Sequence, residues 1–161
     1  MSENEPEICS CAALRQAARR VTRLYDDALA PTGLGVNQYS ILARLNRVGP
    51  STIQDLARRL VMDRSTLGHL LRPLEKRGLV RLHVSEEDGR SHVTTLTPAG
   101  RAVVAKGRPL WARAQQRFAS AFGEKSALEL RTALKQVAMA DFGDAATTDD
   151  GADARKEQRN E

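Results

Sequence analysis

Residues 55–100 read DLARRLVMDRSTLGHLLRPLEKRGLVRLHVSEEDGRSHVTTLTPAG, and this stretch decides the fold. Its middle part predicts an amphipathic helix, because apolar residues recur at i, i+3, i+4 and i+7. The predicted buried stripe consists of Leu67, Leu70, Leu71 and Leu74. Asp63 is a natural N-cap for this helix, and Gly78 is placed to end it as a C′ glycine.

The opposite face of this helix carries small or donor-rich side chains, which suit the major groove of DNA. They are Ser65, Gly68, His69, Arg72 and Lys76. Pro73 removes the amide that would bond to the His69 carbonyl, so we expect the last turn to be kinked or loosened. A shorter helix precedes it, with Leu56, Ala57 and Leu60 as its inner face. Ser51 or Thr52 can cap that helix, with Gln54 or Asp55 as the return partner.

A β-hairpin is predicted after the two helices. Residues 79–84 and 91–96 are short strand candidates, and the Asp-Gly pair between them is a strong hairpin signal. Thr97 and Pro98 then indicate an N-cap and an N1 proline that open a long helix, interrupted by Gly107 and Pro109. A helix-turn-helix followed by such a wing holds one helix in a DNA groove while a loop contacts the backbone. A transcriptional regulator is therefore the leading interpretation.

Further helices are predicted on both sides of this stretch. An amphipathic helix begins near Leu14 and ends at Pro31 and Gly33, and a second helix ends at Gly49. The last helix follows Gly123, with inner candidates Leu128, Leu130, Leu134 and Val137.

Composition supports a helical protein with a polyanionic partner. Only 4% of the 161 residues are aromatic, so the core must rely on Leu, Ala and Val. The formal charge is +5, but residues 141–161 hold seven acids and three bases, which leaves +9 on residues 1–140. Excess positive charge favours binding to phosphates. The sequence has no apolar run long enough for a membrane span and no signal-like N-terminus, so we expect a cytoplasmic protein without membrane contact.

The wing and the helices beside it resemble the MarR family of bacterial winged-helix regulators. DGRSHVTTLTPAG is similar to the family's D-x-R-x(5)-L-T pattern, and TLGHLLRPLEKRGLV is nearly as specific. The resemblance implies a mainly α fold with a small β-wing. It also implies a winged helix-turn-helix at about 35–97, dimerisation helices at 11–34 and 98–140, a flexible N-terminus at 1–10 and a disordered acidic tail at 141–161. One departure is Gly35, where members often have a capping Thr or Ser; this costs about 0.5 kcal/mol.

The resemblance implies DNA contacts from the recognition helix and the wing. The implied residues are Arg64, Ser65, Thr66, His69, Arg72, Asp88 and Arg90. A solvent-exposed turn is the alternative for Asp88 and Arg90, and a neutral surface histidine for His69. The family acts as a two-fold dimer on a pseudo-palindromic operator, commonly as a repressor that a small ligand releases. An apolar surface compatible with a dimer is offered by Leu14, Val21, Trp111, Phe118, Phe122, Leu130 and Leu134.

Two kinds of signal are compatible with the sequence. The resemblance implies a small aromatic or anionic effector, and its candidate lining residues are Arg15, Arg19, Tyr25, Tyr39 and Trp111, each of which has a structural alternative. Oxidation is the other signal, through Cys11 and its neighbour Cys9. Cys11 and Tyr25 have the spacing of the organic-hydroperoxide branch, but Arg15 and Val36 stand where that branch has further tyrosines. An inert thiol at a frayed helix end is the alternative.

Other classes of function have little support in the sequence. It contains no nucleophile motif, no phosphate-cradling glycine loop and no catalytic carboxylate or histidine cluster, so neither an enzyme nor a cofactor is predicted. The cysteines and histidines lack zinc-ligand spacing, so no metal is expected. A winged helix that binds only proteins is the remaining alternative, but such a module would carry apolar residues at Ser65, His69 and Arg72.

Overall fold

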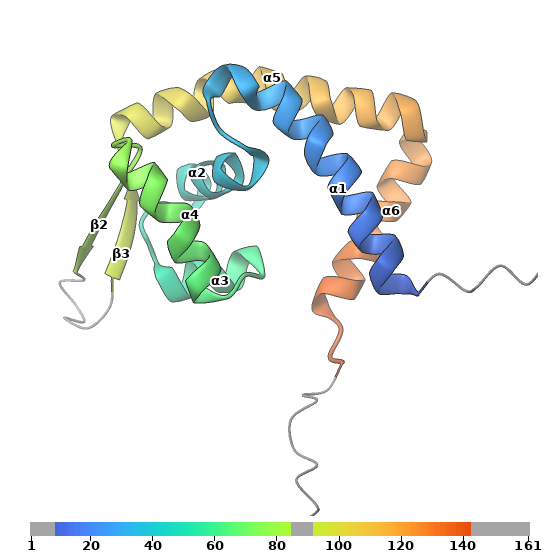
Figure 1. Ribbon diagram of the computed structural model, residues 1–161, viewed down its shortest axis with the longest axis horizontal. Helices are drawn as coiled ribbons and strands as arrows, with labels where there is room; N and C mark the ends of the chain where they lie inside the picture. Colours follow the sequence, from blue (N-terminus) through green and yellow to red (C-terminus); the bar gives the residue numbers. More distant parts are fainter. Residues whose placement is uncertain (1–8, 85–91, 143–161) are drawn as a thin grey trace, which may run out of the picture. The chain divides into compact units, whose positions relative to one another are not determined.

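The chain folds into helices with one small sheet, as predicted for its fold class (Figure 1). A computed structural model describes residues 9–84 and 92–142. Its elements are α1 (Ser10–Leu29), a 3-10 turn (Ala30–Thr32), α2 (Val36–Val48), β1 (Ser51–Thr52), α3 (Ile53–Leu60), α4 (Arg64–Lys76), β2 (Val80–Val84), β3 (His92–Leu96), α5 (Pro98–Phe122) and α6 (Glu124–Met139).

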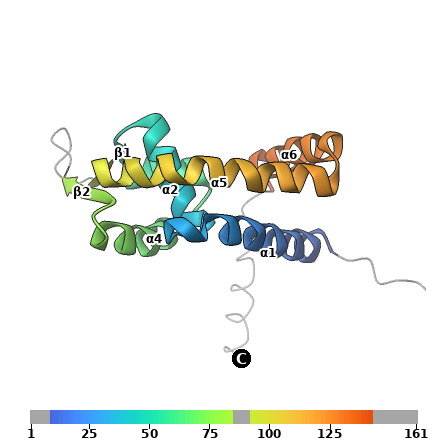
Figure 2. The same ribbon diagram turned by 90° about the horizontal axis from the view of Figure 1, so that it is seen from above.

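The chain divides into two units, Met1–Ala127 and Leu128–Glu161. In the first unit, α1 and α5 run beside each other, and α2 packs against α5 (Figure 2). The α3–α4 pair and the sheet complete a winged helix-turn-helix next to α2. In the second unit, α6 continues from Leu128 to Met139. The predicted flexible segment 1–10 and acidic tail 141–161 lie mostly outside the described residues. Helix α1 begins at Ser10, one residue before the dimerisation segment expected at 11–34.

The sheet has three antiparallel strands in the order β1-β3-β2. Leu82 on β2 and Ser51 on β1 both pair with Thr94 on β3, so β3 is the central strand. The hairpin strands were predicted to within one residue, but β1 was not predicted. Its two residues were expected only as candidates for a helix cap. Thr52 is both a strand residue, paired with Val93, and the cap, because its hydroxyl accepts from the Asp55 amide at 3.1 Å.

The core lies between α2, α3 and α4 and confirms the predicted leucine stripe. Leu67, Leu71 and Leu74 are at most 1% exposed, while Leu70 lies at the edge of the core. They meet residues of α2 and α3 that are equally buried: Ile41, Leu42, Leu45 and Leu56. Full burial of such side chains stabilises a fold by about 2 kcal/mol each. This packing fixes which face of α4 is left for solvent.

The proline in α4 does not end the helix. The helix continues through Pro73 to Lys76, so its last turn is formed. Only one amide is lost, and the turn is closed by the Arg77 amide, which donates to the Pro73 carbonyl at 3.1 Å. The Leu79 amide also donates to the Leu74 carbonyl at 2.9 Å, which gives Gly78 the expected C′ role.

The long helix α5 is likewise uninterrupted at Gly107 and Pro109, contrary to expectation. Gly107 is a site of close packing: a Cβ there would lie 2.3 Å from Cε2 of Tyr39. The Tyr39 ring therefore occupies the space that any larger residue would need. Its hydroxyl donates to the Val104 carbonyl at 3.2 Å, and burial raises its pKa, with a smaller opposing effect from Arg108.

The N-terminus of α2 has a cap that the sequence did not predict. Gly35 has no side chain, but Oδ1 of Asp26 on α1 accepts from the Val36 amide at 2.7 Å. A carboxylate at this end of a helix also interacts favourably with its dipole. The missing cap at Gly35 is thus replaced by a residue of a different helix, which ties α1 to α2.

Candidate nucleic-acid interface

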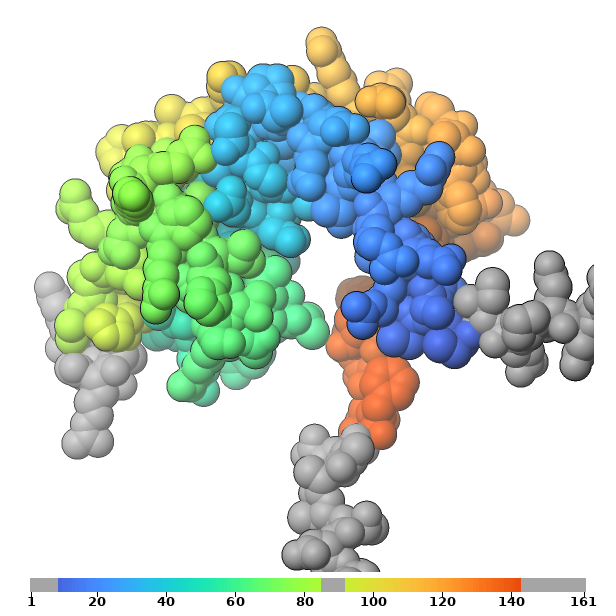
Figure 3. All heavy atoms as spheres, viewed as in Figure 1, coloured from blue at the N-terminus to red at the C-terminus, as the bar shows by residue number. Residues whose placement is uncertain are grey.

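The solvent-facing side of α4 carries the predicted polar stripe. Ser65, His69, Arg72 and Lys76 are exposed, and Gly68 is half-buried among them. Arg64 and Thr66 are exposed at the start of the same helix. In the space-filling view, the green atoms of α3 and α4 lie at the surface (Figure 3). A helix with one leucine face in the core and one polar face in solvent has the form needed to enter a major groove.

The first turn of α4 is organised by Asp63. Its carboxylate accepts from the Ser65 hydroxyl at 2.6 Å, the Thr66 amide at 2.7 Å and the Thr66 hydroxyl at 2.7 Å. These bonds, that of Ser65 foremost, hold the pKa of Asp63 well below its ordinary value. A hydroxyl has a single hydrogen to donate. Ser65 and Thr66 therefore direct their hydrogens to Asp63 and leave oxygen lone pairs free to accept.

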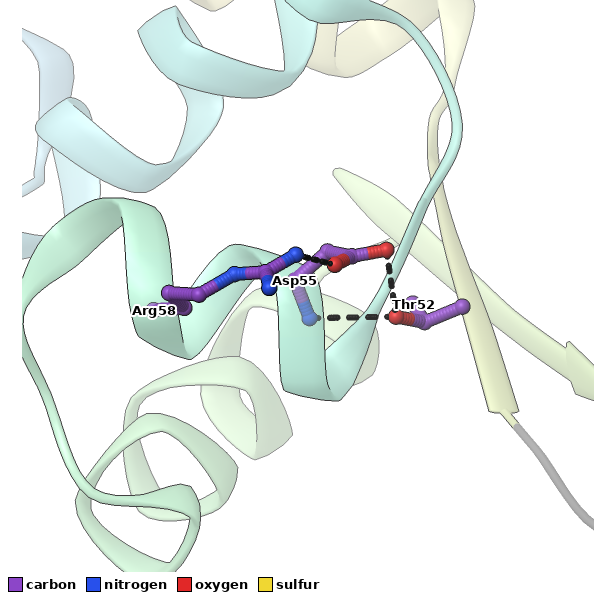
Figure 4. Close-up of polar contacts among 3 residues, drawn as sticks. All are labelled: Thr52, Asp55 and Arg58. Carbon is purple, nitrogen blue, oxygen red and sulfur yellow. Dashed lines mark hydrogen bonds and ion pairs between the residues drawn. The ribbon is translucent and has the colours of Figure 1, made fainter.

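The preceding helix α3 holds one of its two arginines in an ion pair. Asp55 accepts from Arg58 and, at 3.1 Å, from the Thr52 hydroxyl (Figure 4). An exposed pair of this kind adds little stability. Its effect here is to offset the charge of Arg58, so that Arg59, which is also exposed, is the better candidate for a phosphate contact from α3.

The wing residues predicted to contact DNA, Asp88 and Arg90, lie outside the described residues. The structure describes the strands on each side of them. Val84 pairs with His92 and His83 with Val93, so the ends of the two flanking strands are next to each other. This pairing agrees with the predicted hairpin, while the contacts of Asp88 and Arg90 stay predictions.

The structure places the five candidate effector residues in different surroundings. Tyr25 and Trp111 are neighbours, with ring centroids 6.5 Å apart, and the Tyr25 hydroxyl donates to Oε1 of Gln115 at 2.6 Å. Tyr39 is only 5% exposed and belongs to the core. Arg15 and Arg19 lie exposed on α1. A shallow depression of about 590 Å³ on α5 is lined by other residues: Arg113, Gln116, Arg117, Ser120 and Ala121.

Both cysteines are exposed free thiols at the start of α1. Cys9 is the N-cap, and its sulfur accepts from the Ala12 amide at 3.4 Å. The sequence favoured Cys11 as the residue at the helix start, but Cys9 makes the contact with the helix end. In residues 9–84 and 92–142, no three His, Cys, Asp or Glu side chains gather as metal ligands would. No helix in these ranges is long and apolar enough to cross a membrane.

Comparisons with known proteins agree with this architecture. The organic hydroperoxide resistance transcriptional regulator of Bacillus subtilis is 31% identical over 90 residues, which are 56% of this chain and 61% of that protein. The chain thus spans about three fifths of the length of this curated relative. The match with solved structures is more extensive. The regulator MosR of M. tuberculosis, solved in complex with DNA, is 34% identical with a TM-score of 0.74, covering 81% of this chain and 93% of that one.

A third similar protein is the transcriptional repressor CouR, solved with p-coumaroyl-CoA. It is 27% identical with a TM-score of 0.75, and the match covers 86% of this chain and 98% of CouR. Residues 32–91 match the model of the MarR family. These relatives are transcriptional regulators and not enzymes, in agreement with the expectation from the sequence. The chain therefore belongs to the MarR family of winged helix-turn-helix transcriptional regulators.

Proposed function

We propose that this protein is a dimeric, sequence-specific DNA-binding repressor that leaves its operator when an effector binds. The observation that carries the proposal is the face of α4, where Ser65, His69 and Arg72 are exposed opposite a fully buried leucine stripe. Side chains of these types hydrogen-bond to base edges or phosphates. The net charge of +9 on residues 1–140 supports a polyanionic partner.

Selection of bound genomic fragments, followed by mobility-shift titration, tests this function. We expect Arg72→Ala and Arg90→Ala each to weaken operator binding by at least about tenfold, within the cost of about 1–3 kcal/mol for a lost base contact. The affinity should also fall steeply with salt, because bound phosphates release counterions. A protein that selects no fragment at low salt contradicts the proposal. It would favour the alternative, a winged helix that binds only proteins.

The effector is proposed to be a small aromatic or anionic molecule bound near Tyr25 and Trp111. Their rings are adjacent, and Trp111 is still 39% exposed. CouR, which has the same fold, was solved with the aromatic thioester p-coumaroyl-CoA. Trp111 is the only tryptophan of the sequence, so its fluorescence is a direct probe. A molecule that releases the operator without changing this fluorescence would exclude the Tyr25–Trp111 region as its site.

Oxidation of the cysteines is the second candidate signal. It is favoured by the exposure of both thiols and by the contact of the Cys9 sulfur with the first turn of α1. Exposed thiols are accessible to peroxides, which oxidise them to sulfenic acids. We expect peroxide to weaken operator binding by the wild type and to leave the double variant Cys9→Ser/Cys11→Ser unaffected. Equal behaviour of the two proteins would remove oxidation from the mechanism.

A further inference from the structure

The turn between α1 and α2 is held by cationic side chains from two other helices. Residues 31–33 offer three successive backbone carbonyls as acceptors. Nη1 of Arg77 donates to the Gly33 carbonyl at 2.8 Å, and Nη2 donates to the Thr32 carbonyl at 3.4 Å. Nζ of Lys106 on α5 donates to the Pro31 carbonyl at 2.7 Å. Three hydrogen bonds therefore connect this one turn to α4 and α5.

The turn is held by its own hydrogen bonds, so it is a suitable anchor. The Thr32 side chain is buried, and its hydroxyl donates to the Leu29 carbonyl at 2.7 Å. The same hydroxyl oxygen accepts from the Leu34 amide at 3.2 Å, and the Gly33 amide donates to the Ala30 carbonyl at 2.9 Å. With its own polar groups satisfied internally, the turn presents its outer carbonyls in a fixed geometry.

Arg77 lies at the end of α4 that is remote from the predicted base contacts. It is the C-cap residue, whereas Asp63 is the N-cap. The 13 residues between them extend over about 18 Å. A tilt of about 5° at the Arg77 end would move the Ser65 end by about 1.6 Å, which exceeds the tolerance of a hydrogen bond at ~3 Å.

We propose that Arg77 is a positioning residue for DNA recognition. It fixes the direction of α4 against the α1–α2 turn and does not itself bind DNA. Since α1 is one of the predicted dimerisation helices, the same contact sets where each α4 points within a dimer. This inference rests on the proposed function, because the direction of α4 matters for recognition only if α4 reads an operator.

The geometry of Arg77 distinguishes this role from a phosphate contact. Both terminal nitrogens of its guanidinium are directed at carbonyls of the turn, over a sequence separation of more than 40 residues. A planar fork can satisfy two neighbouring acceptors at once, which an ammonium group does less well. Arg101 is a natural control: it is exposed, and its Nη1 donates at 3.1 Å to the Leu96 carbonyl, which is close in sequence and links no distant elements.

The test compares Arg77→Ala, Arg77→Lys and Arg101→Ala on the selected operator and on versions with one base pair inserted between the half-sites. We expect the wild type and Arg101→Ala to lose at least about tenfold in affinity on insertion, because rigid heads require one spacing. Arg77→Ala should bind the original operator at least about fivefold more weakly, yet lose less than about threefold on insertion. Its salt dependence should match that of the wild type, because no phosphate contact is removed.

Three results would overturn the inference. The first is an unchanged affinity and spacing preference for Arg77→Ala. The second is a slope of log affinity against log salt concentration that is lowered by about one in Arg77→Ala, as expected for a lost phosphate contact. The third is an equal effect of Arg77→Ala and Arg101→Ala. If Arg77→Ala does not fold, Arg77→Lys replaces it in the comparison, and this variant should relax the spacing preference in part. A wild type that binds no DNA contradicts the proposed function and this inference together, whereas normal wild-type binding with an unaffected Arg77→Ala contradicts the inference alone.

Discussion

At the scale of single residues, Asp63 determines which hydrogen bonds the hydroxyls in the first turn of α4 can make in the proposed DNA contact. A Ser or Thr hydroxyl whose hydrogen is not already bonded can donate to guanine or thymine and accept from adenine or cytosine. With their hydrogens directed to the Asp63 carboxylate, Ser65 and Thr66 can only accept. They would therefore favour bases that present an amino group in the major groove, and they would not donate to phosphates.

Asp63→Ala tests this donor assignment. The variant releases both hydroxyl hydrogens, so the operator positions read by Ser65 or Thr66 should lose their preference for adenine or cytosine. Parallel in vitro selection with the wild type and the variant would reveal the change as a relaxed base preference at those positions. Ser65→Ala is the control, because it removes one reader and leaves the cap on the Thr66 amide. Identical base preferences in the wild type and Asp63→Ala would contradict the assignment.

At the scale of elements, α2 depends on a cap from another helix. Asp26 on α1 takes the place that a side chain at residue 35 would otherwise fill. Asp26→Ala should lower the free energy of unfolding by about 1 kcal/mol, because it leaves the Val36 amide without its acceptor. Chemical denaturation measures this loss.

A second substitution makes the cap prediction more specific. Gly35→Ser supplies a local cap, so it should restore much of the stability lost in Asp26→Ala and add little to the wild type. Gly35 has the extended backbone typical of an N-cap residue, with φ −77° and ψ 162°, so serine fits without strain. Additive effects of the two substitutions would mean that Asp26 does not act as this cap.

The features that the sequence predicted are those with a local cause. The caps at Asp63 and Thr97 and the leucine stripe of α4 follow from spacings of a few residues, and all are present. The contacts of Asp26 and Arg77 join different elements, at sequence separations of 10 and 44 residues, so no pattern within one element predicts them. The Gly107 error has a related cause. Gly107 was predicted to interrupt α5, but it accommodates the ring of Tyr39, which is distant in sequence and adjacent only in the folded chain.

The residues predicted to contact DNA show the same division. Helical spacing was enough to predict that Ser65, His69 and Arg72 share the face opposite the leucines, and the structure exposes all three. Spacing could not predict that Asp63 would occupy the Ser65 and Thr66 hydroxyls, or that Asp55 would offset Arg58. Whether these contacts form depends on side-chain rotamers, which the spacing of residues does not specify.

At the scale of the whole molecule, each unit carries apolar side chains that the single chain leaves exposed. In the first unit Leu14 is 39% and Phe122 50% exposed, and in the second Leu134 is 40% and Val137 43% exposed. Large apolar side chains on this scale usually mark an interface. A second copy of the chain is the partner proposed for these surfaces, since a two-fold dimer presents two α4 helices to successive turns of DNA.

Leu134→Lys tests whether this surface holds the dimer. A buried apolar residue replaced by a charge would leave that charge unpaired in the interface, so the dimer should dissociate at micromolar concentration. Sedimentation would then show a monomer, and operator affinity should fall by at least about 100-fold, because each monomer reads one half-site. Gln136→Lys is the matched control: it adds the same charge to α6 two residues away, about 200° around the helix, and should leave both measurements unchanged. A Leu134→Lys protein that remains a dimer and binds normally would place the interface elsewhere.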